Sequence, residues 1–256
     1  LASVIRLCRK YDVPYQVIGN GSNLLVGDRG IRGLVIEMLS KEDEICVEDD
    51  CITVGAGMLL SKTANRAAEH GLTGMEFAAG IPGSIGGAVV MNAGAYSGEM
   101  KDILTAVTVL DQEGNEKILS AEELELGYRT SCLLNKGYIV TGAKIKLKHG
   151  EETAIRARME ELKKQRVEKQ PLEYPSAGST FKRPEGYFAG KLIMDAGLRG
   201  YLVGEAQVSE KHCGFVINRG NATAADVRTL MQNVADIVEE KFGVRLEPEV
   251  KMIGEF

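Results

Sequence analysis

Apolar side chains recur at helical spacing most clearly near the carboxyl end of the chain. In residues 223–242 they return every three or four positions, which predicts an amphipathic helix with one buried face and no role in chemistry. Thr223 and Asp226 have the spacing of a capping box, and Gly243 is a typical residue just past a helix end. The expected stripe consists of Val227, Leu230, Met231, Val234, Ile237, Val238 and Phe242.

Three further stretches have helical patterns. Residues 1–10 place Val4, Ile5, Leu7 and Cys8 mostly on one side, and residues 58–70 form a helix that should stop at Gly71. The highly charged stretch 151–171 reads as a long helix closed by Pro171. We expect its charges to form a solvated face, and the helix to link two domains.

Short runs with strand character occupy most of the chain before this linker. They are "PYQVIG", "GLVIE", "CITVGAG", two strands joined by a Gly-Asn turn in "ILTAVTVLDQEGNEKIL", and "YIVTGAKIKLK"; "EVKMI" is a final strand. The change in pattern near residue 150 predicts a first, strand-rich domain over 1–150, divisible into 1–40 and 41–150, and a second domain over 151–256.

Composition and charge narrow the function classes. The chain has 256 residues, 44% hydrophobic and 26% charged, with a net charge of −5, which argues against a nucleic-acid partner but not against an anionic small ligand. No apolar run is long enough to span a bilayer. The first residue is Leu, within an apparent helix, so we expect the natural chain to begin further upstream.

The cysteines and histidines point to no metal site. Five cysteines, an odd number without a CxxC pair, predict free thiols in a reducing compartment. Three histidines are present, and none stands near a second ligand at metal spacing.

Two glycine-rich loops are the first candidates for binding. "GNGSNLLV" (19–26) follows a predicted strand, and "AAGIPGSIGGAVVMNAGAYSGE" (78–99) contains a short helix whose start, near Gly83 and Ser84, suits a pyrophosphate. Neither is a Walker loop or a dinucleotide fingerprint. The alternatives are an ordinary loop and tight backbone packing; two such loops in one strand-rich domain favour a nucleotide cofactor.

Ser179, in "YPSAGSTFKRP", raises the question of a nucleophile. Phe181 stands where a GxSxG elbow needs its second glycine, and no histidine lies nearby in sequence, so a nucleophilic role is disfavoured. "GYRTS" with Arg129 and "LEPEV" with Glu249 carry little meaning alone, because most such charges are exposed.

Taken in order, the motifs resemble those of UDP-N-acetylenolpyruvoylglucosamine reductases. "GNGSNLLV", "AGIPGSIGGAVVMNAGAY", "GYRTS", "YPSAGSTFKRP", "AGLRG", "AQVSEKHCGFVIN" and "LEPEV" carry the resemblance along the whole chain, in the family's second type, which lacks an extra substrate-capping loop. The family's Thr-Thr-Phe-Arg-Ile-Gly-Gly-like motif is absent. The implied fold is an FAD-binding domain of the vanillyl-alcohol-oxidase type followed by an α+β substrate-binding domain.

The resemblance implies a two-step reduction in peptidoglycan synthesis, and with it a part in cell shape and division, in the cytoplasm. NADPH reduces FAD, and flavin N5 then passes hydride to C3 of the enolpyruvyl sugar nucleotide. Arg129 stabilises the resulting enolate, and Ser179 gives a proton to C2 with Lys182 nearby. Glu249 is either protonated or orients Arg129. No nucleic-acid, membrane or obligate protein partner is implied.

The resemblance also implies binding residues. Those expected at FAD are Gly19, Asn20, Gly21, Ser22, Asn23, Leu24, Gly80, Gly83, Ser84, Gly86, Gly87, Asn92, Gly94, Tyr96 and Val140. Those expected at the substrate are Tyr128, Arg183, Tyr187, which would lie against the uracil, Arg199 and His212. Two alternatives stay open: a flavin oxidase or dehydrogenase with another electron acceptor, and a sugar-nucleotide-binding protein without turnover.

Overall fold

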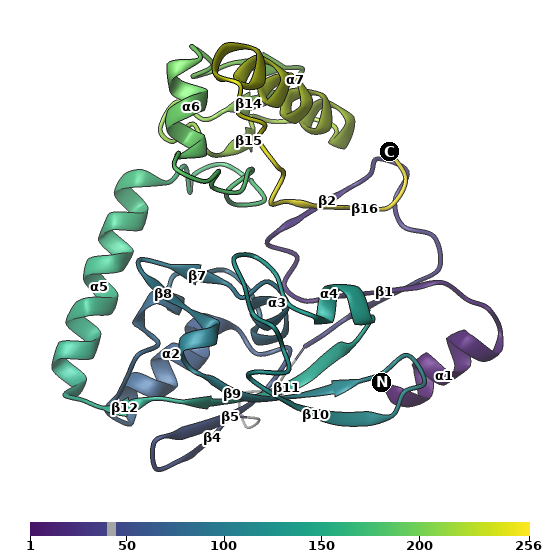
Figure 1. Ribbon diagram of the computed structural model, residues 1–256, viewed down its shortest axis with the longest axis vertical. Coiled ribbons are helices and arrows are strands. Elements are labelled where there is room, and N and C mark those ends of the chain that lie inside the picture. The colour runs from purple at the N-terminus through teal and green to yellow at the C-terminus, as the bar shows by residue number, and fades with distance from the viewer. Residues whose placement is uncertain (40–44) are drawn as a thin grey trace. The chain divides into compact units, whose positions relative to one another are not determined.

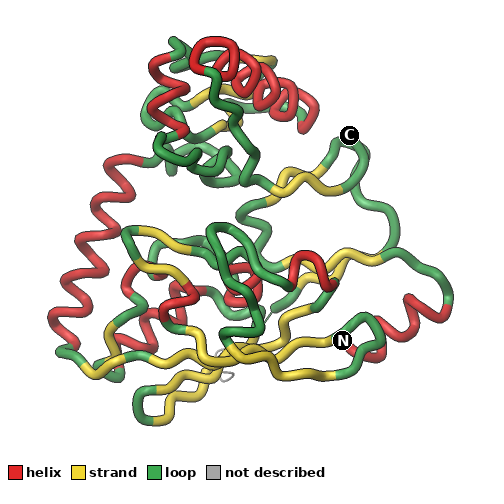
Figure 2. The backbone as a smooth tube through the Cα atoms, viewed as in Figure 1, coloured by secondary structure: helices red, strands yellow, loops and turns green. Residues whose placement is uncertain are grey.

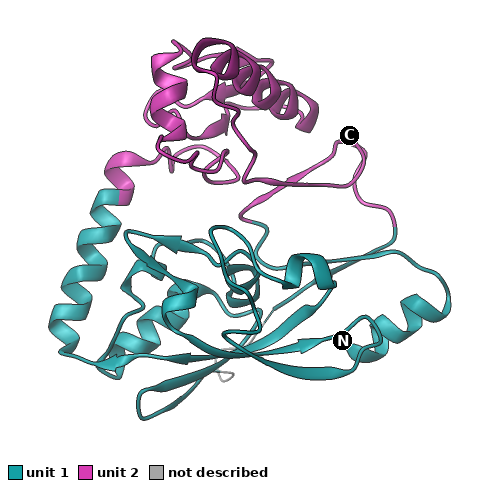
Figure 3. Ribbon diagram, viewed as in Figure 1, with its two compact units in different colours: residues 1–21, 33–165 teal, residues 22–32, 166–256 magenta. Residues whose placement is uncertain are grey.

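The computed structural model describes residues 1–39 and 45–256 and divides them into two compact units (Figure 3). Unit 1 comprises residues 1–21 and 33–165, and unit 2 comprises 22–32 and 166–256. The division falls within helix α5 (Glu152–Lys169), the charged helix expected from the sequence. The predicted domains, 1–150 for FAD binding and 151–256 for substrate binding, differ in range from these compact units. Their assignment to the two functions stays a prediction.

A five-stranded antiparallel sheet forms the centre of unit 1 (Figure 1). Its order is β10-β9-β11-β5-β4, with β4 Ile45–Glu48, β5 Cys51–Gly55, β9 Leu104–Leu110, β10 Glu116–Ser120 and β11 Ile139–Lys146. The predicted hairpin with a Gly-Asn turn is confirmed as β9–β10. Asp111 closes it, because its carboxylate accepts the N–H groups of Glu113 at 3.0 Å and Asn115 at 2.8 Å.

Short helices and strands complete unit 1. Helix α2 packs Leu60, Ala64 and Ala67 into the main core, and α3 packs on β11 and β5. The elements are α1 Ala2–Lys10, β1 Tyr15–Ile18 parallel to β3 Leu34–Glu37, α2 Leu60–Glu69, β6 Leu72–Thr73 with β12 Lys148–His149, η2 Glu76–Ala78, α3 Ile85–Val90, β7 Gly94–Ala95 with β8 Gly98–Glu99, η3 Met100–Asp102 and α4 Leu133–Lys136.

Helix α1 is confirmed, but its predicted apolar face is partly wrong. Ile5 and Cys8 are buried, whereas Val4 and Leu7 are exposed. The pair Val4 and Leu7 lies one residue, or about 100° around the helix, away from Ile5 and Cys8. Only the second pair is therefore buried, and Ile5 packs with Leu110 and Ile139 in a small separate core.

Unit 2 packs two helices on a small antiparallel sheet. The sheet is β13 Leu202–Val203, β14 Ala206–Val208 and β15 Val216–Asn218; α6 is Ala189–Asp195, α7 is Ala224–Phe242, and β2 Leu24–Val26 runs parallel to β16 Lys251–Ile253. The segment from Pro171 to Phe188 is mostly loop (Figure 2). Ser179 lies in this segment.

Helix α7 confirms the clearest pattern in the sequence. Thr223 and Asp226 form the predicted capping box, and Gly243 ends the helix at φ +68°. Most of the stripe is buried or partly buried, but Phe242 is 40% exposed and was wrongly included, because it lies in the last turn beyond the core. Among the described residues, no helix is both long and apolar enough to cross a membrane.

Candidate active site

The two glycine-rich loops meet in unit 1. Asn20 Nδ2 donates to the Pro82 carbonyl oxygen at 2.6 Å, which places the first loop on the start of the second. A Cβ at Gly19 would lie 2.2 Å from Ser84 Oγ, so only glycine allows this approach. The sequence predicted both loops, and the structure brings them together.

Helix α3 begins at this junction. Ser84 caps it by accepting the Gly87 N–H at 3.4 Å, and the Gly86 N–H donates to the Ala56 carbonyl at 2.7 Å. A Cβ at Gly86 would lie 3.0 Å from that of Ala56, so this glycine serves backbone packing. By contrast, a Cβ at Gly21 (φ +68°) would have no described atom within 4 Å. Ser84 is 2% exposed, whereas the open backbone at Gly21 suits a phosphate-bearing cofactor.

The rest of the first loop belongs to unit 2. Asn23 Nδ2 donates to the Glu249 carbonyl at 3.2 Å, and the Asn23 carbonyl accepts the Lys251 N–H at 2.9 Å. Leu24 begins β2 and pairs with Lys251. The cofactor contacts of Ser22, Asn23 and Leu24 stay predictions, while the contacts seen tie Asn23 to a predicted catalytic residue.

Arg129 lies on a tight turn in unit 1. Gly127 and Thr130 exchange backbone hydrogen bonds of 3.1 and 3.3 Å, so Tyr128 and Arg129 form the two central positions. Arg129 Nη2 donates to the Gly94 carbonyl at 3.1 Å, and its guanidinium lies 5.1 Å from the Tyr128 ring centre. Tyr128, a predicted substrate residue, is 51% exposed.

Backbone strain gathers around this turn. Arg129 has φ +55°, which a long side chain rarely adopts. The neighbouring β7–β8 hairpin turns through Tyr96 (φ +51°) and Ser97 (φ +68°), a geometry that normally requires Asn and Gly. Each such residue costs about 1–3 kcal/mol, and such strain concentrates at functional sites. The positive φ angles of Tyr96 and Arg129 are therefore in keeping with their prediction as site residues.

Two predicted cofactor residues of this region are engaged within the protein. A Cβ at Gly94 would lie 2.7 Å from Gly98 O, which makes this glycine a requirement of the hairpin. Asn92 is fully buried, and its amide forms hydrogen bonds with protein partners, while its cofactor contact stays a prediction. Val140 is buried in the core of β11. The cofactor roles of Gly80, Gly83, Gly94 and Val140 stay predictions.

Ser179 lies on a segment of unit 2 that pairs with two other segments. Ser179 bridges Phe215, and the Thr180 N–H donates to the Gly214 carbonyl at 2.9 Å. The Glu249 N–H donates to the Thr180 carbonyl at 2.8 Å. The structure thus brings Ser179 and Glu249 into one strand-like layer, with the Ser179 residue exposed.

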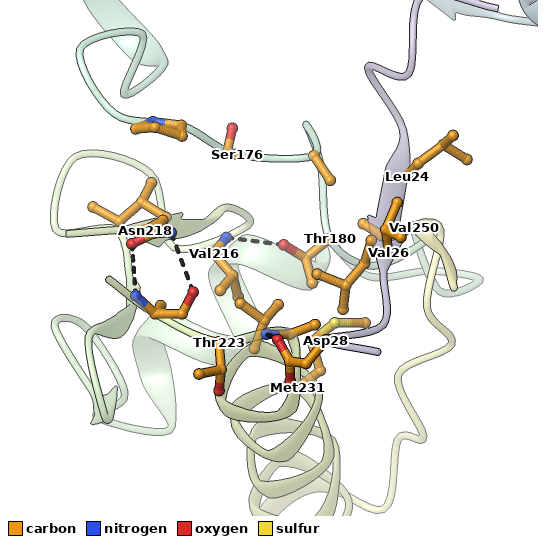
Figure 4. Close-up of a pocket in the computed structure, with 17 residues that line it drawn as sticks. Leu24, Val26, Asp28, Ser176, Thr180, Val216, Asn218, Thr223, Met231 and Val250 are labelled. Carbon is orange, nitrogen blue, oxygen red and sulfur yellow. Dashed lines mark hydrogen bonds between the residues drawn. The ribbon is translucent and has the colours of Figure 1, made fainter. Parts of the chain in front are cut away.

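Thr180, next to the exposed Ser179, is buried. It is 2% exposed, and its Oγ1 accepts the Val216 N–H at 2.9 Å beside a cavity of about 410 Å³ (Figure 4). The cavity is lined by β2, residues 175–177, Thr180, β15 and the start of α7. Asp28 stands at its rim and accepts the N–H groups of Ala224 and Ala225. This cavity backs the Ser179 segment.

The predicted substrate residues lie in two clusters of unit 2. Arg183 stacks 3.9 Å from the Phe188 ring centre and donates to the Tyr187 carbonyl at 3.2 Å. Tyr187 and Phe188 are 47% and 61% exposed, so this cluster offers a cation and two aromatic rings to solvent. Phe188 was missed from the sequence, although "GYF" beside an arginine was an available signal.

The second cluster surrounds residues 209–214. Arg199 donates to the Glu210 carbonyl at 2.7 Å. His212 Nδ1 accepts the Gly214 N–H at 3.1 Å, and its ring meets Phe215 edge-on at 5.1 Å. Burial lowers the pKa of His212 below its usual value of 6.5, which favours the neutral ring. Lys182 forms an ion pair with Glu247 at 3.0 Å.

Comparison with known proteins identifies relatives along the whole chain. The model for the UDP-N-acetylenolpyruvoylglucosamine reductase C-terminal domain matches residues 170–253, and an FAD binding domain model matches residues 1–120. The UDP-N-acetylenolpyruvoylglucosamine reductase of Agathobacter rectalis is 59% identical over 268 residues, covering 100% of this chain and 85% of the relative. That of Caldanaerobacter subterraneus subsp. tengcongensis is 54% identical, covering 100% and 84%.

A solved structure supports the same assignment. The crystal structure of the Thermus caldophilus UDP-N-acetylenolpyruvylglucosamine reductase superimposes with a TM-score of 0.83 at 42% identity, covering 96% of this chain and 88% of that one. The predicted FAD-binding α+β fold and the oxidoreductase class are confirmed. The chain belongs to the UDP-N-acetylenolpyruvoylglucosamine reductase family.

Proposed function

We propose that this chain reduces the enolpyruvyl group of UDP-N-acetylglucosamine enolpyruvate with NADPH, which yields UDP-N-acetylmuramate for peptidoglycan. The observation that carries the proposal is the exposed Ser179, held by main-chain pairing beside Glu249. A cytoplasmic location is part of the proposal.

The junction of the glycine-rich loops suits FAD. Gly19, Asn20 and Gly21 would hold its phosphates, because the backbone is open at Gly21, while Ser84 caps the start of α3 beneath them. When bound, FAD supplies the hydride that NADPH has delivered to it. NADPH acts as a co-substrate and leaves before the sugar nucleotide binds.

Arg129 stabilises the charge that the reaction creates. Hydride addition at C3 leaves negative charge on C2, delocalised into the adjoining carboxylate. A guanidinium keeps its proton and binds a carboxylate through two parallel hydrogen bonds. Because its backbone is already strained into position, Arg129 needs little reorganisation when the charge develops.

Ser179 completes the reduction by protonating C2. Its O–H bond breaks as the new C–H bond at C2 forms, and the alkoxide regains a proton from solvent after product release. Serine is a weak acid, but a carbanion beside a carboxylate is a strong base, so a hydroxyl held within hydrogen-bond reach is competent. Full turnover of Glu249→Gln with the enolpyruvyl substrate would contradict both predicted roles of Glu249.

The proposal is tested by following flavin absorbance in two stages without oxygen. NADPH should bleach the flavin of the purified protein, and the enolpyruvyl sugar nucleotide should restore its colour with formation of UDP-N-acetylmuramate. Colour that returns with oxygen but not with this substrate would favour the flavin oxidase. A colourless protein that binds UDP-sugars would favour a binding protein without turnover.

A further inference from the structure

We propose that Asn92 is a positioning residue for Arg129, fixing the turn that carries it to the β7–β8 hairpin. The proposal rests on the role of Arg129 in the proposed function.

The Asn92 side chain makes three hydrogen bonds. Its Nδ2 donates to Glu99 Oε2 at 3.0 Å and to the Gly127 carbonyl at 3.0 Å, while its Oδ1 accepts the Lys101 N–H at 2.9 Å. The residue is 0% exposed. Two acceptors face the amide nitrogen and one donor faces the oxygen, so the partners allow one orientation of the amide.

Gly127 connects this network to Arg129. Gly127 forms the closing pair of the turn with Thr130, and Arg129 is one of the two residues between them. A shift of the Gly127 carbonyl therefore shifts the base of the turn. The Arg129 guanidinium is held at its other end by Gly94, which belongs to the hairpin that Asn92 anchors through Glu99.

The backbone conformation of Asn92 also suits asparagine. Its φ is +41°, and asparagine tolerates this left-handed region better than most residues. Aspartate shares both its shape and this tolerance. Asn92→Asp therefore changes the hydrogen-bonding pattern while preserving the size of the side chain.

The Asn92→Asp carboxylate would face the Glu99 carboxylate and the Gly127 carbonyl, and it would repel both. We expect flavin reoxidation by the enolpyruvyl substrate to slow by about 10- to 100-fold. This is the usual effect of losing a residue that orients a catalytic group through a hydrogen bond. Flavin reduction by NADPH and the Kd for FAD, measured by fluorescence, should stay unchanged. The defect should shrink as the pH falls, because protonation of this buried carboxyl restores a donor.

A double variant separates positioning from folding. In Asn92→Asp/Glu99→Gln, the new amide at 99 can donate to the carboxylate at 92, which restores that link, but the Gly127 carbonyl still lacks its donor. We expect Tm to recover while reoxidation stays slow. The positioning role would be overturned if the double variant recovered both Tm and the rate of reoxidation. It would also be overturned if neither the single nor the double variant bound flavin.

Arg129→Ala distinguishes the failure of this inference from the failure of its premise. Unchanged reoxidation in Arg129→Ala would refute the proposed role of Arg129 and, with it, the positioning of Arg129 by Asn92. Slow reoxidation in Arg129→Ala with normal, pH-independent reoxidation in Asn92→Asp would overturn the Asn92 inference alone. Slow reoxidation in both, with normal reduction by NADPH, is the expected result.

Discussion

The turn that carries Arg129 and the segment that carries Ser179 are held in place by different means. The Ser179 segment is fixed mainly through its main chain, by pairing with Phe215, Gly214 and Glu249, with one side-chain bond from the Val216 N–H to Thr180 Oγ1. The Arg129 turn depends on side chains: Asn92 Nδ2 on Gly127, Ser131 Oγ on the Val90 carbonyl at 2.7 Å, and its own guanidinium on Gly94.

This difference predicts different responses to mutation. Main-chain pairing survives most side-chain changes, so substitutions near Ser179 should affect either chemistry or stability, but rarely both. Each side-chain anchor of the Arg129 turn can be removed by a single substitution. Substitutions of residues far from the reacting atoms should therefore displace Arg129 and slow the reaction. Strain at Arg129 increases this sensitivity, because the turn relaxes once its anchors are lost.

Arg129→Lys should show the largest effect on the side-chain-held turn. Lysine keeps the charge but loses the planar fork, so flavin reoxidation by the enolpyruvyl substrate should slow by about 10²- to 10³-fold. Rapid mixing of the NADPH-reduced protein with substrate measures this rate. Arg156→Lys, a substitution of an exposed residue on α5, is the control. A change of less than tenfold would mean that charge alone suffices.

Thr180→Val tests the main-chain-held segment. Valine has the shape of threonine but leaves the buried Val216 N–H without its acceptor, which should lower the free energy of unfolding by about 1–3 kcal/mol. Urea unfolding measures this change. Thr180→Ser, which retains the hydroxyl, should lose less stability. If reoxidation slows strongly in Thr180→Val at a temperature where it is folded, main-chain pairing does not insulate Ser179 as described.

His212 should give the smallest effect, seen as a pH dependence of stability. Because its pKa is lowered in the folded protein, the unfolded chain binds more protons as the pH falls below about 6.5. The contribution of neutral His212 to the free energy of unfolding is therefore complete above that pH. It is lost as the pH decreases toward the pKa of His212 in the folded protein. His212→Asn, whose Oδ1 can accept the Gly214 N–H, should flatten this slope. An unchanged slope would assign it to other groups.

The sequence predicted those elements whose signals are local. The cap of α7 and the β9–β10 hairpin depend on neighbouring residues, and both are present. Strand β2 was missed within a glycine-rich loop, because its partner β16 lies at the other end of the chain. Strands β13 to β15 have only two or three residues each, too few for alternation to be visible.

The candidate site was predictable in identity but not in arrangement. Ordered motifs pointed to Arg129, Ser179 and Glu249, and to the two glycine-rich loops. The orientation of Asn92 depends on Glu99, Lys101 and Gly127, and no local pattern encodes that combination. Thr180 was missed for the same reason, since its importance follows from its tertiary neighbour Val216.

The most direct test of the account is the Ser179→Ala variant, studied one half-reaction at a time. Ser179 is exposed and held by its main chain, so its removal should leave Tm, FAD binding and flavin reduction by NADPH unchanged. Reoxidation by the enolpyruvyl sugar nucleotide should fall by about 10²- to 10⁴-fold, the usual contribution of a positioned proton donor. Ser176→Ala, on the same exposed segment, should behave as wild type. Equal loss in both half-reactions, or normal reoxidation, would contradict the assignment of Ser179 as the proton donor.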